Sequence, residues 1–171
     1  MAAEKKASPN VESLLRHNIL KMPQEVYQAS GIVINGRRLK SFVFTTDLAI
    51  IRNCDADAVF AVYPFTPQQA ISDAIIKASY IPVIITVTKA DTDIRARLES
   101  GASILNVACS TDTPRIVKKI RDAFPDVPII ASGGKTGESI SATIAAGANA
   151  ITYTPPSPAI LFKEMMEKYR E

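Results

Sequence analysis

IPVIITVTK (residues 81–89) and VPIIASGGK (residues 127–135) decide the fold, because these two similar stretches stand 46 residues apart. The same offset aligns ESGASILNVACS (residues 99–110) with AAGANAITYTPP (residues 145–156). A fixed period of this length indicates a repeated structural unit. Each repeat contains two apolar runs, so predicted strands begin every 23 residues, near Ala58, Ile81, Ile104, Val127 and Ala150.

A third repeat appears when residues 55–67 are laid over residues 101–113. Apolar strands that alternate with amphipathic helices are typical of a parallel sheet covered by helices. Each repeat would supply a quarter of an eight-stranded barrel. With a first strand at residues 42–45, we therefore predict an α/β fold: a TIM-barrel-like parallel (βα) barrel with about six strands.

The chain before the first strand carries helix and turn signals. Ser8 and Pro9 suit the start of a helix, which Val11, Leu14, Leu15, Ile19 and Leu20 make amphipathic. A shorter helix is expected at residues 24–29, and Asn35-Gly36 predicts a hairpin turn. We expect one domain over residues 1–171, with an N-terminal helical segment (1–31) and barrel units (32–171).

Composition narrows the classes of function. The 171 residues are 47% hydrophobic and carry a net charge of only +3, with Lys and Arg scattered. We expect no nucleic-acid partner, no membrane span and a cytoplasmic location. Cys54 and Cys109 have no metal-ligand spacing, so we expect no metal site. Because no secretory signal is seen, we expect two free, buried thiols instead of a disulfide, and we expect no cofactor.

The carboxyl ends of parallel barrel strands are where ligands bind, and that rule selects the candidate site residues. The strongest candidate is the turn formed by Ser132, Gly133, Gly134 and Lys135. Two glycines let backbone N–H groups approach an anion, and the start of the next helix adds partial positive charge. An anion site and a tight turn without a ligand both fit this pattern.

Two charged residues at other strand ends are candidates for catalysis. Lys89 could pair with an anion, act as a Schiff-base nucleophile or be a solvated loop residue. Asp47 could be a general base or could cap the helix after the first strand. The only histidine, His17, lies in the N-terminal segment, which excludes a Ser-His or Cys-His mechanism in the barrel.

Further polar residues could complete an anion or substrate site. Asn106 lies inside an apolar strand, where a buried amide would either bind ligand or tie the barrel together. Thr152 and Thr154 belong to the last strand and would face the same site. Cys109 lacks a neighbouring base that would make it a nucleophile.

The stretches KSFVFTTDLAIIRN, DAVFAVYPFTPQ, IIASGGKTGESI and AGANAITYTPP resemble a family of bacterial eight-stranded barrel proteins often labelled only as hydrolases. The resemblance covers residues 32–171. It implies a TIM barrel in which two more strand–helix units lie between YPFTPQ and IPVIITVT. This chain passes directly from one to the other, so the resemblance and the repeat both indicate a missing quarter.

Two classes of function follow. The first is an enzyme, a hydrolase, lyase or isomerase that acts on a small phosphorylated or carboxylated metabolite. The second is a metabolite-binding or scaffold protein without catalysis; a flavin-binding barrel is a third option, since an ASGG turn can hold flavin phosphate. An incomplete barrel would expose strand edges between strands two and three, which predicts a homodimer.

Overall fold

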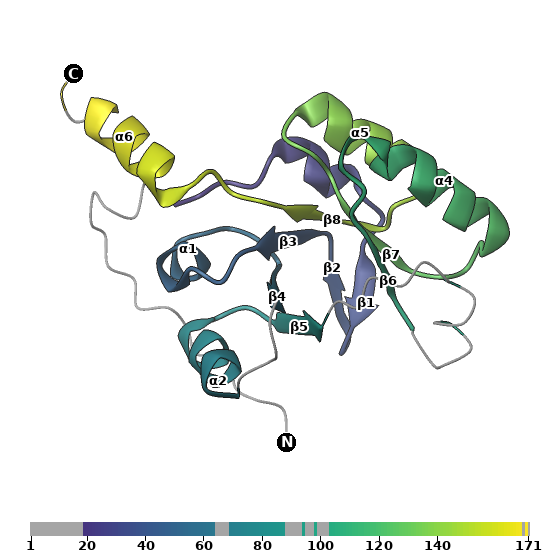
Figure 1. Cartoon of the computed structure of the whole chain (residues 1–171), viewed down its shortest axis with the longest axis horizontal. Helices are drawn as coiled ribbons and strands as arrows, with labels where there is room; N and C mark the ends of the chain where they lie inside the picture. Colours follow the sequence, from purple (N-terminus) through teal and green to yellow (C-terminus); the bar gives the residue numbers. More distant parts are fainter. Residues whose placement is uncertain are drawn as a thin grey trace.

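The structure is a computed structural model that describes residues 19–63, 69–87, 94, 98, 103–168 and 170. Six of the described strands form one parallel sheet in the order β5-β4-β3-β8-β7-β6. The sheet is curled like an open barrel, with helices around its outside and a small hairpin inside the curve (Figure 1). The sequence prediction of a parallel α/β fold is therefore confirmed.

The elements follow one another in the order that the sequence predicts. The sheet strands are β3 (Ser41–Phe44), β4 (Ala58–Tyr63), β5 (Val83–Val87), β6 (Leu105–Val107), β7 (Ile129–Ser132) and β8 (Ala150–Tyr153). The helices are η2 (Gln24–Gln28), α1 (Leu48–Arg52), α2 (Gln69–Ala78), η3 (Ser110–Asp112), α4 (Thr113–Ala123), α5 (Gly137–Ala145) and α6 (Pro158–Lys168). The repeated strands begin within two residues of their predicted starts.

The strand order shows that the sheet is wound in one direction. From β3 to β4 to β5 the chain steps one way across the sheet, and from β6 to β7 to β8 it steps the same way. Right-handed crossovers then place the connecting helices on one face. A doubly wound sheet reverses direction and carries helices on both faces. One-way winding, with the first and last strands, β3 and β8, paired, gives a curled half-barrel sheet; the described strands do not close into a full barrel.

The opening of the sheet lies elsewhere than the sequence predicted. Strands β4 and β5 were expected to flank the gap, but they are paired in parallel from Val59 with Val83 to Tyr63 with Val87. In the described residues the unpaired edges belong to β5 and β6. The expectation was wrong because a 46-residue repeat predicts which segments are strands, whereas the place of a break depends on pairing between them.

Alternate residues of each strand face two different apolar layers. Outward side chains such as Val59 and Ile129 pack with α1, α2, α4 and α5. Inward side chains form a separate cluster with the hairpin β1 (Ile32–Ile34) and β2 (Arg37–Leu39); its buried members are Ile32, Leu39, Phe42, Ala58, Phe60, Ile130 and Ala150. This period of two is the one expected for strands covered on both faces.

The hairpin fills the amino-terminal end of the concave face. Asn35 and Gly36 both have positive φ, at 50° and 75°, as the tight turn between β1 and β2 requires. Ile32 and Leu39 are buried against Phe42 and neighbouring inward residues. The predicted hairpin is confirmed, and the part of the concave face that it leaves uncovered lies towards the carboxyl ends of the strands.

Candidate functional site

The turn between β7 and α5 is built by local hydrogen bonds and steric fit. Thr136 caps α5: its Oγ1 accepts from Ser139 N, and Thr136 N donates to Ser139 Oγ, each at 3.2 Å. Ser139 Oγ also donates to the carbonyl oxygen of Gly133 at 2.7 Å. The turn is thus held in shape by the chain itself.

The two glycines of the turn are required for different structural reasons. A Cβ at Gly133 would stand 2.7 Å from Ile151 Cγ2 and 2.8 Å from Ile140 Cγ1, so only glycine lets α5 pack this closely on β8. Gly134 has a φ of +77°, which favours glycine. Gly133 N already donates to Thr152 O at 3.3 Å. Of the backbone amides of Gly133, Gly134 and Lys135, that of Gly133 is therefore already engaged in the sheet.

The other two amides are not engaged. Gly134 N and Lys135 N donate no hydrogen bond to any residue in the part of the chain that the structure describes. Both residues are exposed at the carboxyl end of β7, one turn before the amino end of α5. Successive free N–H groups near a positive φ form a concave donor site that suits an anion.

Hydroxyl groups lie beside this turn. Ser132 Oγ and Thr152 Oγ1, on the neighbouring strands β7 and β8, are 3.4 Å apart. Thr152 is buried and Ser132 is half-buried, whereas Thr154, just beyond β8, is exposed. The structure thus brings Ser132, Gly134, Lys135 and Thr152 to one place on the rim.

A carboxylate from another segment also reaches α5. Glu25, in η2, lies against Gly137: its Oε1 is only 2.3 Å from the position that a Cβ would take at Gly137. Gly137 is the first residue of α5, so this negative charge lies against the positive end of the helix dipole. Sequence reasoning did not include Glu25, because no local pattern links residue 25 to residue 137.

Asp47 lies at the amino end of α1 and caps it. Its Oδ1 accepts from Ala49 N at 2.8 Å and from Ile50 N at 3.2 Å. Between the two alternatives left by the sequence, the structure shows the capping role. Lys89, the other predicted catalytic residue, lies outside the described residues.

Replacing Asp47 with Ala is expected to lower the free energy of unfolding by about 1 kcal/mol, because two amides of α1 lose their acceptor. Asp47→Asn keeps an acceptor oxygen and should lose much less. Urea denaturation measures both. Equal losses in the two variants would show that the charge, and not the cap, is what α1 requires.

The strand β6 places two predicted residues at the surface. Asn106 was expected to be buried, but it is exposed, because β6 is an edge strand and this position faces the open concave side. Cys109 was expected to be buried and is exposed, while Cys54 is half-buried; both are free thiols. Burial raises the pKa of the Cys54 thiol.

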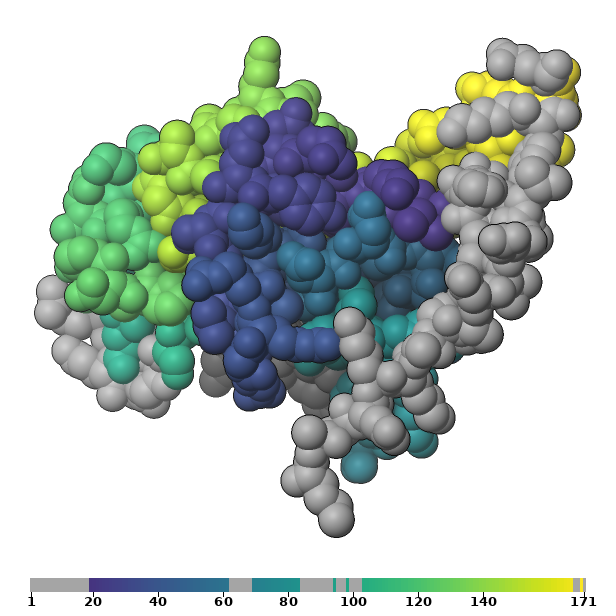
Figure 2. All heavy atoms as spheres, turned by 180° about the vertical axis from the view of Figure 1, so that it is seen from behind, coloured from purple at the N-terminus to yellow at the C-terminus, as the bar shows by residue number. Residues whose placement is uncertain are grey.

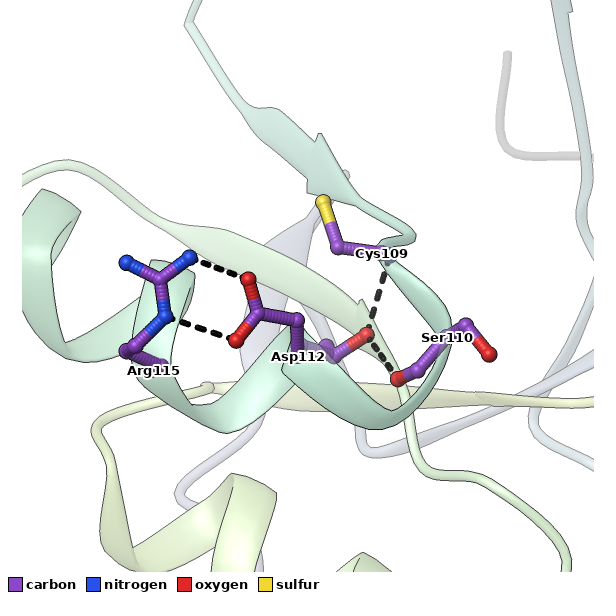
Figure 3. Close-up of polar contacts among 5 residues, drawn as sticks. Cys109, Ser110, Asp112 and Arg115 are labelled. Atoms are coloured by element: carbon purple, nitrogen blue, oxygen red, sulfur yellow. Dashed lines mark hydrogen bonds and ion pairs between the residues drawn. The ribbon is translucent and has the colours of Figure 1, made fainter.

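The loop after β6 is closed by its own side chains (Figure 3). Cys109 N donates to Thr113 Oγ1 at 2.9 Å, and that hydroxyl donates to Ser110 O at 2.8 Å. Arg115 donates to both carboxylate oxygens of Asp112 and thereby lowers the pKa of that carboxyl group. Ser110, which has a positive φ of 52°, lies in this closed loop, and its carbonyl oxygen takes part in the hydrogen bonds.

A groove of about 370 Å³ lies at the opposite end of the sheet. Its walls are the hairpin, with Arg37 and Arg38, and the segments before β4 and β5, with Asp57 and Tyr80. Ligands of parallel α/β folds bind at the carboxyl ends of the strands, which favours the β7–β8 rim over this groove.

No protein-family model matches the chain, and no curated protein matches it either. Within the described residues, no three His, Cys, Asp or Glu side chains gather closely enough to bind a metal ion. None of the described helices has the length and apolar character needed to cross a membrane.

Proposed function

We propose that this protein binds a small anionic metabolite, phosphorylated or carboxylated, at the carboxyl ends of β7 and β8. The observation that carries the proposal is the pair of adjacent amides, Gly134 N and Lys135 N, that donate to no described residue. Backbone donors at a helix start are well suited to a phosphate or carboxylate group. The hydroxyls of Ser132 and Thr152 would bind the polar part of the same ligand.

Several features of the turn support this binding mode. The capping box of Thr136 and Ser139 fixes the turn, so little conformational entropy would be lost when an anion binds. Lys135 adds a full positive charge to the partial charge at the amino end of α5. Pro155 and Pro156, which follow β8, have no N–H groups, so the backbone donors to the anion would come from the β7–α5 turn.

If the protein is an enzyme, it would act on such a metabolite as a hydrolase, lyase or isomerase. Asp47 and Lys89 would then lie at the part of the ligand that reacts. Such an activity is also suggested by the resemblance to the bacterial barrel family. The capping role of Asp47 favours the second candidate, binding without turnover, because Oδ1 is already committed to two amides of α1. Asp47→Asn, which preserves an acceptor, is the variant that distinguishes a catalytic carboxylate from a cap.

Assembly into a homodimer also stays a proposal. The unpaired edges of β5 and β6 are open to pairing with another chain. A closed twofold arrangement is the commonest way to cover such edges. A cytoplasmic location remains an expectation from the sequence.

The anion site predicts a specific pattern in an NMR titration with inorganic phosphate. The amide signals of Gly134 and Lys135 should shift in a saturable way at millimolar phosphate, and Lys135→Met should weaken the binding several-fold because a nearby positive charge is lost. Lys118→Met, on the exposed face of α4, is the matched control and should leave the affinity unchanged.

Glu25→Gln provides a test in the opposite direction. Removing a negative charge beside the start of α5 should tighten phosphate binding, since like charges repel in this partly enclosed place. The proposal would be contradicted if phosphate shifted neither amide signal. It would also be contradicted if phosphate bound the Lys135→Met variant as tightly as the unaltered chain.

A further inference from the structure

The segment just before the hairpin covers the seam between the first and last strands of the sheet. Met22, Val26 and Ala29 are at most 1% exposed. Val26 packs with Ile151 of β8, and Met22 packs with Val43 of β3. Residues 20–29 therefore occupy a place in the outer layer, next to α5, where η2 makes its contacts.

This arrangement leaves α6 without a place on the sheet. In a sheet wound one way, the helix that follows β8 would cover β8 and the adjacent β3. Because η2 and its flanking residues cover that seam, α6 projects away from the body of the molecule (Figures 1 and 2). Phe162 is 60% exposed, and among the described residues of the helix Leu161 is the one that packs against the nearby core cluster.

Four apolar side chains of α6 form a stripe along the helix, while Ile160, 51% exposed, lies to the other side of Leu161. Leu161, Phe162, Met165 and Met166 stand at positions i, i+1, i+4 and i+5, which share a face. Leu161, Met165 and Met166 are half-buried, so the exposed edge of the stripe is the Phe162 side. An apolar stripe of this kind on a projecting helix is suited to contact another helix.

The described part of the chain starts, at residue 19, beside the amino end of α6. Leu20 packs in the same cluster as Leu161 and Tyr153, and Leu20 N donates to Asn53 O at 2.7 Å. Figure 1 shows the start of the coloured chain beside the start of α6. Residues 1–18, which lie outside the described part, are therefore joined to the molecule where the exposed stripe of α6 starts.

The sequence of residues 8–18 has the pattern of a matching helix. Ser8 and Pro9 suit its start, and Val11, Leu14 and Leu15 share one face at i, i+3 and i+4. Both this segment and α6 contain 11 residues, so as helices they would each be about 16 Å long. The covalent connection gives the segment a high effective concentration at α6, which a second chain lacks.

We propose that residues 8–18 form an amphipathic helix that packs against α6, with Leu14 and Leu15 covering Phe162 and Met166. The N-terminal segment would complete a helix pair beside the β3–β8 seam. This inference does not depend on the proposed anion site, which lies at the carboxyl end of β7.

A single tryptophan tests the packing, because the chain has none of its own. In the full chain carrying Phe162→Trp, fluorescence emission should lie at shorter wavelength than in the urea-unfolded chain. Adding Leu14→Asp and Leu15→Asp should move it to longer wavelength, because the covering side chains are lost. Ser13→Asp, on the opposite face of the predicted helix, is the control and should leave emission unchanged.

Two results would overturn the proposal. One is emission from Phe162→Trp that already matches the unfolded chain, which would mean that nothing covers the stripe. The other is emission that depends on protein concentration but not on the leucine substitutions, which would identify a second copy as the partner.

A disulfide provides a second measurement that does not rely on tryptophan. In a chain with Cys54→Ser and Cys109→Ser, the pair Leu15→Cys and Met166→Cys should form a bond within one chain on mild oxidation. A bond only between chains, or no bond, would count against the proposal. Ser13→Cys with Met166→Cys is the matched control and should not be linked.

Discussion

Phe42→Ala is expected to lower the free energy of unfolding by about 3 to 5 kcal/mol, the range for a fully buried phenylalanine. Phe42 is 0% exposed on the concave face of the sheet. Its ring meets that of Phe60 edge to face, with centroids 6.4 Å apart. The same cluster contains Ile32 and Leu39 of the hairpin, so the truncation would leave a cavity where the hairpin meets the sheet.

Phe44→Ala is the matched control on the same strand. Phe44 also faces Phe60, at 6.3 Å between centroids, but it is 38% exposed. Its loss should cost about half as much or less, because part of its surface already contacts water. Urea denaturation of both variants measures the difference. Similar losses for Phe42 and Phe44 would mean that the hairpin does not seal this end of the sheet.

Arg121→Met is expected to destabilise the fold by about 2 kcal/mol, because several half-buried acceptors lose a charged donor at once. Arg121 Nη2 donates to Gly147 O at 2.8 Å and to Asn149 Oδ1 at 2.6 Å, and Nη1 donates to Val127 O at 3.0 Å and to Pro125 O. One side chain of α4 thus ties together the segments that lead into β7 and β8.

The Arg121 network extends beyond the arginine. Asn149 Oδ1 also accepts from Ile129 N at 2.9 Å, and its Nδ2 donates to Ser30 Oγ at 3.0 Å. Lys118→Met, on the exposed face of the same helix, should change stability by less than about 0.5 kcal/mol. A loss at Arg121 no larger than the loss at Lys118 would show that the network contributes nothing to stability.

The parts of the fold predicted correctly depend on local chemistry. The strands of the repeat show as apolar runs, and the hairpin depends on the positive φ that Asn35 and Gly36 adopt. Helix caps such as Asp47 also act within a few residues. Signals of this kind are contained in short stretches and can be predicted without knowing the partners.

The parts missed depend on contacts between distant residues. Asn106 was expected to be buried because the apolar residues around it suit a central strand, yet β6 lies at an edge. Cys109, expected to be a buried free thiol, follows that edge strand and is exposed. The cover of the β3–β8 seam by Val26 and the approach of Glu25 to α5 join segments over 100 residues apart. No local pattern in the sequence encodes these pairs.

The most direct test of the proposed function is a crystal structure grown with phosphate at millimolar concentration. The proposal predicts tetrahedral density within hydrogen-bond distance of Gly134 N and Lys135 N, next to Ser132 Oγ. A Glu25→Gln crystal should show the same anion at higher occupancy. An empty turn in both crystals, with Gly134 N and Lys135 N bonded to the protein itself, would contradict it.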